Sequence, residues 1–498
     1  MAEIISYQME LCQSLPEIIG SIDYKIYKDQ LLRVEEIIEK YELEKIVIGY
    51  NIELKKRERD QKKQRKLSKK EMIKIQKQSI QALRCSIARH LMQDDYRGFS
   101  CRLADSVLLQ SFCKINNIGK IQIPGKSVLQ RYEQMFPEEV IRIVIETLTK
   151  SVIEKSEKIK LEAAVSTKKV YYDTTCIETN IHFPVDWILL RDAVRTLMKA
   201  TILIRKAGLR NRMDNPLEFI KLINKSCIKM TYTRRRKKGK KMRKAILRQM
   251  KKLLKKVERH AMSHYELLKN NWAETNLSEN QAKQILKRIE DIQFQLPAAI
   301  HQAHERIIGE RQVAAEDKIL SLYEPDTNII VRGKLSAEVE YGNKLLLCET
   351  ECGLILDWKL YKEGSPSDSK MIPESLKKIE LSYGKEKKPE EVTGDRGFVS
   401  KESEKYLKEN NIKNYICPRS IEKLNKCLED EIFCENQNRR SQTEGRISIF
   451  KNNFLGKPFR SKGFKSRNLQ VALNVLAHNL WVIARLPQKN IQAELKTA

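Results

Sequence analysis

Residues Lys169–Thr175 read KVYYDTT, and this run of β-branched and aromatic side chains is typical of a buried β-strand. On both sides of it, from residue 1 to about 165 and from about 186 to 314, apolar side chains recur at helical spacing instead. Glycine is also scarce, with 18 residues where an average usage of about 7% gives nearly twice that number. The sequence therefore predicts one strand between two long helical regions.

Strand character returns at Asn328–Arg332. Two more strands, Lys344–Cys348 and Leu354–Tyr361, flank a turn at Thr350–Gly353 and predict a hairpin. The remaining elements of this region alternate: helix Lys370–Ile379, strand Glu391–Asp395, helix Ser400–Asn410, strand Asn414–Cys417 and helix Asn436–Asn452. A hairpin followed by strand–helix alternation predicts an α/β fold in which a mixed sheet is flanked by helices.

These patterns divide the chain into four regions. Residues 1–167 form a helical N-terminal domain, and residues 168–185 together with 315–455 form the core that contains the sheet. Residues 186–314 are a large, basic helical insertion after the first strand, and residues 456–498 hold a basic loop and a closing helix. We expect the catalytic or binding groups in the core, since α/β proteins usually carry them at the carboxyl ends of strands.

Two helices of the N-terminal domain, Leu103–Lys114 and Ser127–Phe136, are separated by a break that contains Pro124 and Gly125. Such a pair resembles a helix-turn-helix DNA reader, in which Lys126, Gln130 and Arg131 would face the DNA. The intervening turn is longer than the usual span of about three or four residues. A plain helical pair is therefore the alternative interpretation.

The overall charge indicates a polyanionic partner. Lys and Arg number 95 against 65 Asp and Glu, a formal net charge of +30, and nucleic acid is the commonest partner of so basic a chain. A membrane is not expected, because the sequence has no bilayer-spanning apolar segment, acylation signal or signal peptide. The 11 cysteines include no C-x-x-C pair, which predicts reduced thiols in a cytoplasmic protein.

The helical insertion contains a dense basic run that continues to Lys256. Its first members are Arg234, Arg235, Arg236, Lys237, Lys238, Lys240 and Lys241. Charge of this density predicts a surface that follows DNA phosphates. The alternative is a solvated face that serves only solubility.

Three segments resemble a known family: Tyr-Tyr-Asp173-Thr-Thr, Val-Thr-Gly-Asp395-Arg-Gly, and Arg440-x3-Glu444-x6-Lys451. They are similar to the signature segments of DDE transposases from bacterial insertion sequences, which have an RNase H-like core, and in particular to those with a Tyr-Arg-Glu-Lys signature. The resemblance covers residues 330–455 and 168–184, about a third of the chain. The chain departs from the signature at the Tyr position, which is Gln437, and in carrying its insertion after the first strand.

The resemblance implies that Asp173, Asp395 and Glu444 are catalytic and hold two Mg²⁺ ions, for which Mn²⁺ would substitute. Carboxylates suit such hard cations, and two ions about 4 Å apart assist in-line phosphoryl displacement. On a helix, Glu444 lies at i+4 from Arg440, and Lys451 lies about 20° from Glu444 around the axis. Both cations would contact DNA phosphates.

The implied function is metal-dependent cleavage at the ends of a mobile element, followed by strand transfer into target DNA. Two DNA ends must be handled together, so a homodimer on DNA is expected, in the cytoplasm and associated with the bacterial nucleoid. The alternative is a repurposed or decayed transposase that acts as a non-catalytic DNA-binding protein. A second enzymatic alternative is a host RNase H-like nuclease, which would lack the large N-terminal domain.

Overall fold

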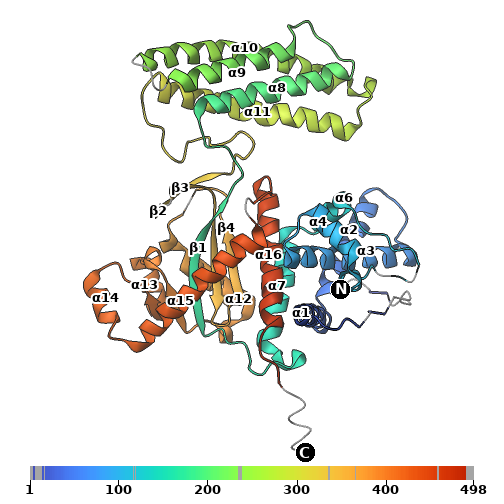
Figure 1. Ribbon diagram of the computed structural model, residues 1–498, viewed down its shortest axis with the longest axis vertical. Helices are drawn as coiled ribbons and strands as arrows, with labels where there is room; N and C mark the ends of the chain where they lie inside the picture. The colour runs from blue at the N-terminus through green and yellow to red at the C-terminus, as the bar shows by residue number, and fades with distance from the viewer. Residues whose placement is uncertain are drawn as a thin grey trace, which may run out of the picture. The chain divides into compact units, whose positions relative to one another are not determined.

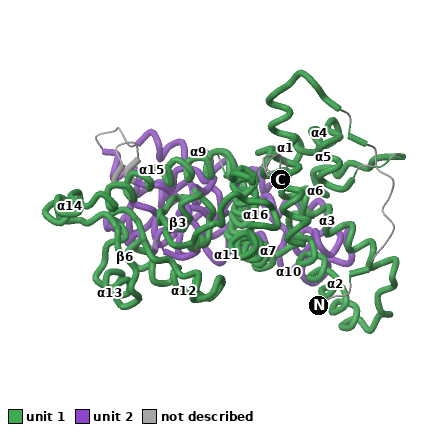
Figure 2. The backbone as a smooth tube through the Cα atoms, turned by 90° about the horizontal axis from the view of Figure 1, so that it is seen from below, with its two compact units in different colours: residues 1–177, 344–361, 365–498 green, residues 178–343, 362–364 purple. Residues whose placement is uncertain are grey.

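The computed structural model describes residues 17–489, apart from 116, 118, 234–237, 335–336, 365 and 457–458, together with 4–5 and 14–15. The chain forms two compact units (Figure 2). Unit 1 comprises Met1–Ile177, Lys344–Tyr361 and Ser365–Ala498, and unit 2 comprises Glu178–Asn343 and Lys362–Gly364. Within the described residues the structure is mixed α/β, as the sequence predicts, with one six-stranded sheet and sixteen α-helices.

The sheet is mixed, as expected. Its strands are β1 (Lys169–Glu178), β2 (Asn328–Lys334), β3 (Ala337–Thr350), β4 (Ile355–Leu360), β5 (Glu391–Gly394) and β6 (Lys413–Ile416). Their order is β2-β3-β1-β5-β6, and β4 also pairs with β3. β3 is antiparallel to β2 and β4, whereas β5 is parallel to β1 and β6. The strand predicted from KVYYDTT is therefore β1, with β3 on one side and β5 on the other.

Four helices follow the hairpin in unit 1: α12 (Met371–Tyr383), α13 (Lys401–Glu409), α14 (Ile421–Cys427) and α15 (Glu431–Ile449). In α12 the buried residues Ile372, Leu376 and Ile379 are spaced four and three apart, so they form one apolar face. The sequence predicts α12, α13 and α15 but not α14, in which no residue is buried. A helix without an apolar stripe leaves no periodic signal.

The N-terminal region of unit 1 is helical, as predicted. It contains α1 (Ile22–Lys40), α2 (Leu43–Gln61), α3 (Lys69–Met92), α4 (Tyr96–Asp105), α5 (Val107–Phe112), α6 (Lys126–Glu133) and α7 (Glu138–Glu154). The helix predicted at Leu103–Lys114 is wrong in one respect, because it is interrupted at Ser106. Extended there, Ser106 ends α4 and caps α5 by accepting a hydrogen bond from the Leu109 amide.

The helix predicted at Ser127–Phe136 is α6, which ends at Glu133. Lys126, Gln130 and Arg131 are all exposed on it. Their side chains are thus accessible to a partner, which both interpretations of this helical pair allow.

The C-terminal helix α16 (Phe464–Ala484) joins the N-terminal helices to the sheet (Figure 1). It contacts α3 and α7 as well as β4, and Val471–Leu480 is buried without interruption. The Asn479 amide accepts a hydrogen bond from the Ile355 backbone N–H (3.0 Å) and donates one to its carbonyl (2.9 Å). One hydrophobic core therefore extends from the N-terminal helices to the sheet.

A buried carboxylate also holds these helices together. Glu133 on α6 accepts hydrogen bonds from Arg89, from the Tyr96 hydroxyl (2.6 Å) and from the Gln470 amide (2.6 Å). Burial on its own raises the pKa of Glu133, but the positive charge of Arg89 and the hydrogen bonds from Arg89 and Tyr96, together with His90, lower the pKa below its usual value. A single charged residue therefore connects α6 to α3, α4 and α16.

Unit 2 contains four long helices: α8 (Asp186–Lys206), α9 (Pro216–Tyr232), α10 (Gly239–Asn271) and α11 (Glu279–Ile307). They share a hydrophobic core of their own, which confirms a helical insertion after the first strand. Ser278 begins α11 with a capping box to Gln281, and Asn215 caps α9 ahead of Pro216.

Two further expectations concern the whole chain. No helix in the described ranges combines the length and apolar character needed to cross a bilayer. No disulfide joins the cysteines that the structure describes.

We predict that Glu133→Gln destabilises the protein by about 3 kcal/mol or more, because Arg89 is left buried without its counter-charge. The measurement is the free energy of unfolding from urea titrations. Glu53→Gln is the matched control, since Glu53 forms an exposed 3.1 Å ion pair with Lys56 and its loss should change stability by about 0.5 kcal/mol or less. Equal effects of the two substitutions would contradict the anchoring role of Glu133.

Candidate functional site

The parallel pairing of β1 with β5 brings two of the three predicted acids together. Tyr171 lies opposite Thr393 in the register, and Asp173 and Asp395 each follow two residues later. Because side chains alternate along a strand, both acids lie on the same face as that pair, at a strand separation of about 4.8 Å. Asp173 and Asp395 are thus neighbours although 222 positions separate them in the sequence.

From the sequence we expect Asp173 and Asp395 to lie at the ends of the first and fourth of the strands that form the core; this is correct for Asp395 but wrong for Asp173. β5 ends at Gly394, immediately before Asp395, whereas β1 continues from Asp173 to Glu178. β1 extends further because β3 lies along its other edge. Asp173 instead marks the place where the pairing of β1 with β5 stops.

Helix α15 covers this face of the sheet and contributes the third acid (Figure 1). The Tyr171 hydroxyl donates to Asn436 (3.1 Å), and the Arg439 guanidinium lies 4.7 Å from the centre of the Tyr171 ring. Asn436, Arg440 and Glu444 are spaced four apart and share one helix face. Beyond the contact between Tyr171 and Asn436, Asp173 lies two residues further along β1. Arg440 and Glu444 lie four and eight residues further along α15.

The electrostatics of Asp173 reflect this convergence. Burial raises its pKa most, and the negative charges of Asp395 and Glu444 raise it further, to about 7. A hydrogen bond from the Thr174 amide and the positive charge of Arg440 act in the opposite direction. The structure therefore brings Asp173, Asp395, Glu444 and Arg440 within electrostatic reach of one another.

The donor set suits a hard divalent cation, although its ligands are not gathered around one point. Three carboxylates are the chemistry that Mg²⁺ prefers. Glu444 is instead engaged by Arg440, whose Nη1 lies 2.6 Å from its Oε1, and the Glu444 side chain is 55% exposed. Among the described residues, no group of three or more His, Cys, Asp or Glu side chains is already placed to hold a metal ion. A cation would have to draw Glu444 away from Arg440.

The glycine of the Asp-Arg-Gly segment has a steric reason. A Cβ atom at Gly397 would lie 3.0 Å from Asp395 Oδ1 and 3.0 Å from Asp368 Oδ2. The Gly397 amide also donates to Asp395 (2.8 Å) and so orients its carboxylate. Any larger residue would crowd two carboxylates at once.

Asp368 is a fourth acid at this site, and sequence reasoning missed it. Its carboxylate accepts a hydrogen bond from the Thr174 hydroxyl (3.1 Å) and pairs with Lys344 (2.9 Å). Asp368 lies in a Ser-rich segment that precedes α12, where nothing in the local pattern distinguishes it from an ordinary loop residue. Only the folded sheet places it beside Asp395.

Gln437 occupies the position at which the related signature has Tyr. Its amide group donates to the carbonyl of Tyr415 (2.7 Å) and accepts a hydrogen bond from Arg440 Nε (3.1 Å). It therefore connects Arg440 to the end of β6. In this chain Gln437 orients the Arg440 guanidinium beside Glu444.

Glu349 on β3 anchors α15, and sequence reasoning missed it too. Its Oε1 is buried and accepts hydrogen bonds from Thr443 (2.7 Å), Arg446 (3.1 Å) and Arg439 (3.4 Å). Arg439, Thr443 and Arg446 occupy positions i, i+4 and i+7 of one helix face, a spacing that indicates a docked helix. The spacing alone does not identify the partner on β3.

The turn between β3 and β4 also contacts α15, through Arg446. Gly353 has φ +88, and a Cβ atom there would lie 2.6 Å from Arg446 Cζ. A residue with a side chain would be strained in this conformation and would also displace the arginine. Glu349 and the β3–β4 turn together fix the segment of α15 that carries Glu444.

The predicted geometry of Lys451 is wrong. α15 ends at Ile449, and Lys451 lies in the π-helical segment Phe450–Leu455. The wider turn of a π-helix rotates Lys451 away from the line expected for a continuous α-helix. Glu444 and Lys451 are therefore not aligned as the spacing predicts.

The basic run belongs to unit 2, whereas the three acids belong to unit 1. Arg234, Arg235, Arg236 and Lys237 lie outside the described residues. Lys238, Lys240 and Lys241 are exposed at the start of α10, and Lys240 pairs with Glu310 at 3.0 Å. The DNA-binding role of this run stays a prediction.

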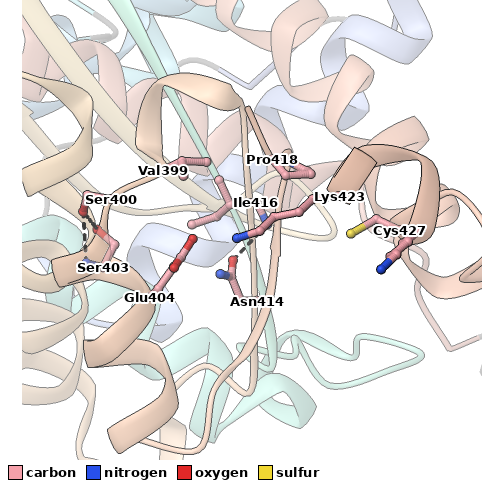
Figure 3. A pocket seen from close by; sticks show the side chains of 10 residues that line it. Val399, Ser400, Ser403, Glu404, Asn414, Ile416, Pro418, Lys423 and Cys427 are labelled. Atoms are coloured by element: carbon pink, nitrogen blue, oxygen red, sulfur yellow. Dashed lines mark hydrogen bonds between the residues drawn. The ribbon is translucent and has the colours of Figure 1, made fainter. Parts of the chain in front are cut away.

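A cavity of about 310 Å³ opens between α13, β6 and α14 (Figure 3). It is lined by residues such as Glu404, Asn414, Ile416 and Lys423. None of the three predicted acids lines it. The convergence of carboxylates is therefore a separate feature of unit 1.

Comparison with known protein families, curated proteins and solved structures finds no match to this chain. Its function is therefore argued from the geometry of the site.

We predict that Asp173→Asn stabilises the metal-free protein at neutral and alkaline pH. The native pKa of about 7 lies above the unfolded value of 3.8, so the native carboxyl contributes its full stability only at low pH. That contribution is lost as the pH rises through 7, whereas Asn is neutral throughout. The gain should be near zero at pH 4 and on the order of 4 kcal/mol above pH 7.

Thermal unfolding in EDTA between pH 4 and pH 8.5 measures this gain. Glu422→Gln, an exposed site on α14, is the control and should show no pH-dependent gain. A difference between Asp173→Asn and the parent that does not vary with pH would refute the raised pKa.

We also predict that Glu349→Ala loosens α15 while the rest of the sheet stays folded. Arg439 and Arg446 lose their shared counter-charge, which should lower stability by about 3 kcal/mol. Hydrogen exchange should accelerate at the amides of residues 439–449. The exposed neighbour Glu351→Ala is the control, and unchanged exchange in α15 would show that Glu349 is not its anchor.

Proposed function

We propose that this protein is the transposase of a bacterial insertion sequence, a metal-dependent enzyme that cuts and joins DNA at Asp173, Asp395 and Glu444. The observation that carries the proposal is the convergence of these acids: Asp173 on β1 and Asp395 just beyond β5 each lie two residues after the paired Tyr171 and Thr393, and the third acid is brought to them by α15. An ordinary structural role does not call for a carboxyl like that of Asp173, whose pKa is raised to about 7 by burial and, further, by the negative charges of Asp395 and Glu444.

The topology of the sheet supports an RNase H-like core. β1 is central, with the antiparallel strands β3 and β4 on one side and the parallel strands β5 and β6 on the other. This is the hairpin followed by strand–helix alternation that the sequence pattern predicts, and unit 2 is inserted after β1, where the chain departs from the family. The acids lie where α/β folds place their chemistry, beyond the end of β5 and beside it on β1.

Asp173, Asp395 and Glu444 would hold two Mg²⁺ ions, with Mn²⁺ as a substitute. When bound, the ions supply activation of the attacking oxygen and stabilisation of the leaving one. Asp173 gives up the proton that its raised pKa retains, because a metal ligand must be deprotonated. Glu444 would have to release Arg440 to hold a metal ion, and the Arg440 guanidinium would then be available to bind a DNA phosphate.

The reaction has two steps at the same site. First, water attacks the phosphodiester at the end of the element: a new P–O bond forms, the bond to the 3′-oxygen breaks, and a 3′-hydroxyl is released. That hydroxyl then attacks a target phosphodiester and displaces the target's own 3′-oxygen. Arg440, held by Gln437, keeps the phosphate in line. The substrates would be the terminal repeats and the target DNA, handled by a homodimer in the cytoplasm.

A non-catalytic DNA-binding protein, derived from a transposase, is the competing proposal. The observation in its favour is the Arg440–Glu444 ion pair, which occupies the third acid. It predicts DNA affinity without cleavage, so the two proposals separate in one assay.

We predict that Asp173→Asn, Asp395→Asn and Glu444→Gln each lower Mg²⁺-dependent strand cleavage by about 100-fold or more, since each removes a ligand charge but preserves its shape. DNA affinity should stay within about threefold of the parent, because phosphate contacts are made by cations. The substrate is a plasmid that carries the sequences flanking the gene.

Glu435→Gln, an exposed site on the same helix, is the matched control and should retain full cleavage. If Glu444→Gln kept activity within about tenfold of the parent, Glu444 would not be a ligand of the catalytic metal. A parent protein that binds the same DNA without cutting it would favour the non-catalytic proposal.

A further inference from the structure

Helix α10 of unit 2 has two contrasting faces. One face is buried against α8, α9 and α11, with Leu247, Met250, Leu254 and Val257 spaced three or four apart. The opposite side carries a line of exposed cations over the same turns, beside the exposed residues Ala245 and Gln249: Lys241, Arg248, Lys252, Lys255 and Arg259. At 100° per residue these five cations fall within a band about 60° wide. We refer to them as the α10 stripe.

The α10 stripe is long and contains no acid. From Lys241 to Arg259 it extends about 27 Å at 1.5 Å per residue. No Asp or Glu occurs between Gly239 and Val257. Glu266 is the first acid on the line of the stripe, seven residues beyond Arg259, and it is exposed.

The stripe differs from the other charges of the same unit. Lys240 and Lys244, beside it on α10, both pair with Glu310, at 3.0 and 2.8 Å. None of the five stripe residues forms an ion pair with any residue that the structure describes. On the exposed face of α11, by contrast, Lys283 and Lys287 alternate with acids such as Glu279 and Glu290.

This arrangement works against the stability of the isolated helix. Arg248 and Lys252, and Lys255 and Arg259, are like charges at i, i+4, each pair destabilising by about 0.2–0.5 kcal/mol. A face that served only solubility would carry both signs, as α11 does. A regular row of unpaired cations is instead complementary to a regular row of anions.

We propose that the α10 stripe binds the sugar–phosphate backbone of duplex DNA without reading its sequence. A straight row of cations about 27 Å long spans most of one turn of duplex, which is about 34 Å. Contacts to phosphate fix position but carry no base information. The choice of DNA as the polyanion rests on the proposed function, but the binding itself needs none of the three acids.

The test is the salt dependence of binding. The five residues are replaced together (Lys241→Gln, Arg248→Gln, Lys252→Gln, Lys255→Gln and Arg259→Gln) in the full-length protein. Binding to a random 30-base-pair duplex is measured by fluorescence anisotropy between 50 and 200 mM KCl. If every stripe residue neutralises one phosphate, the log–log slope flattens by about 4.5, which is five times about 0.9.

The matched control removes the same number of positive charges as the stripe variant, but from exposed positions on α9 and α11. Its substitutions are Lys225→Gln, Lys229→Gln, Lys283→Gln, Lys287→Gln and Arg288→Gln. Its slope should stay close to that of the parent. The stripe variant should also unfold at the same or a higher temperature at low salt, because repulsion has been removed. Loss of binding by a well-folded variant supports the proposal.

Three results would overturn it. The first is an unchanged slope in the stripe variant, and the second is an equal flattening in the control, which would mean that net charge alone attracts DNA. The third is a stripe variant that no longer binds vesicles with anionic lipid, which the parent binds, but still binds DNA as the parent does; the partner would then be a membrane surface. Failure of this proposal is distinguishable from failure of the proposed catalysis. Even if the parent never cuts DNA, its salt-dependent binding can be compared with that of the stripe variant.

Discussion

The register in which β1 pairs with β5 sets Tyr171 opposite Thr393, and the candidate site follows from it. With that register, Asp173 and Asp395 lie side by side on one face. A slip of one residue would turn one of them to the opposite face, since side chains alternate along a strand. The rest of the site supports this pair: Gly397 leaves room for the carboxylates, and α15 covers the same face.

The position of Glu444 depends on another carboxylate, that of the buried residue Glu349 on β3. Glu349 gathers two arginines and a threonine of α15 on one oxygen, so the helix is held by charge-assisted bonds rather than by apolar packing alone. Such a carboxylate is expensive to leave unpaired, which gives the helix one preferred position. Glu444, one residue after Thr443, inherits that position while its own side chain stays exposed. The backbone at Glu444 is thus held in place by Glu349, whereas the Glu444 side chain is exposed and pairs with Arg440.

Local patterns predicted much of the fold but less of the site. KVYYDTT identified β1, and the strand–helix alternation identified β5, β6 and the helices between them, because these elements carry apolar periodicity. The errors came from local changes in helix geometry: Ser106 interrupts a predicted helix, and a π-helical turn displaces Lys451. Asp368 and Glu349 were missed because their partners lie far away in the sequence. The residues next to an acid in the sequence do not show which distant residue it will pair with.

The contact between Asn479 and Ile355 has a consequence for how copies of this chain meet. The asparagine both accepts from and donates to one residue of β4, which is the pattern a neighbouring strand would make. β4 pairs with β3 on one edge only, so its other edge would otherwise offer unmatched backbone groups to a second molecule. An open strand edge of this kind allows copies of a chain to pair edge to edge. The Asn479 side chain, which comes from a helix, occupies that edge at Ile355 and so leaves the backbone groups of this residue unavailable to a second strand.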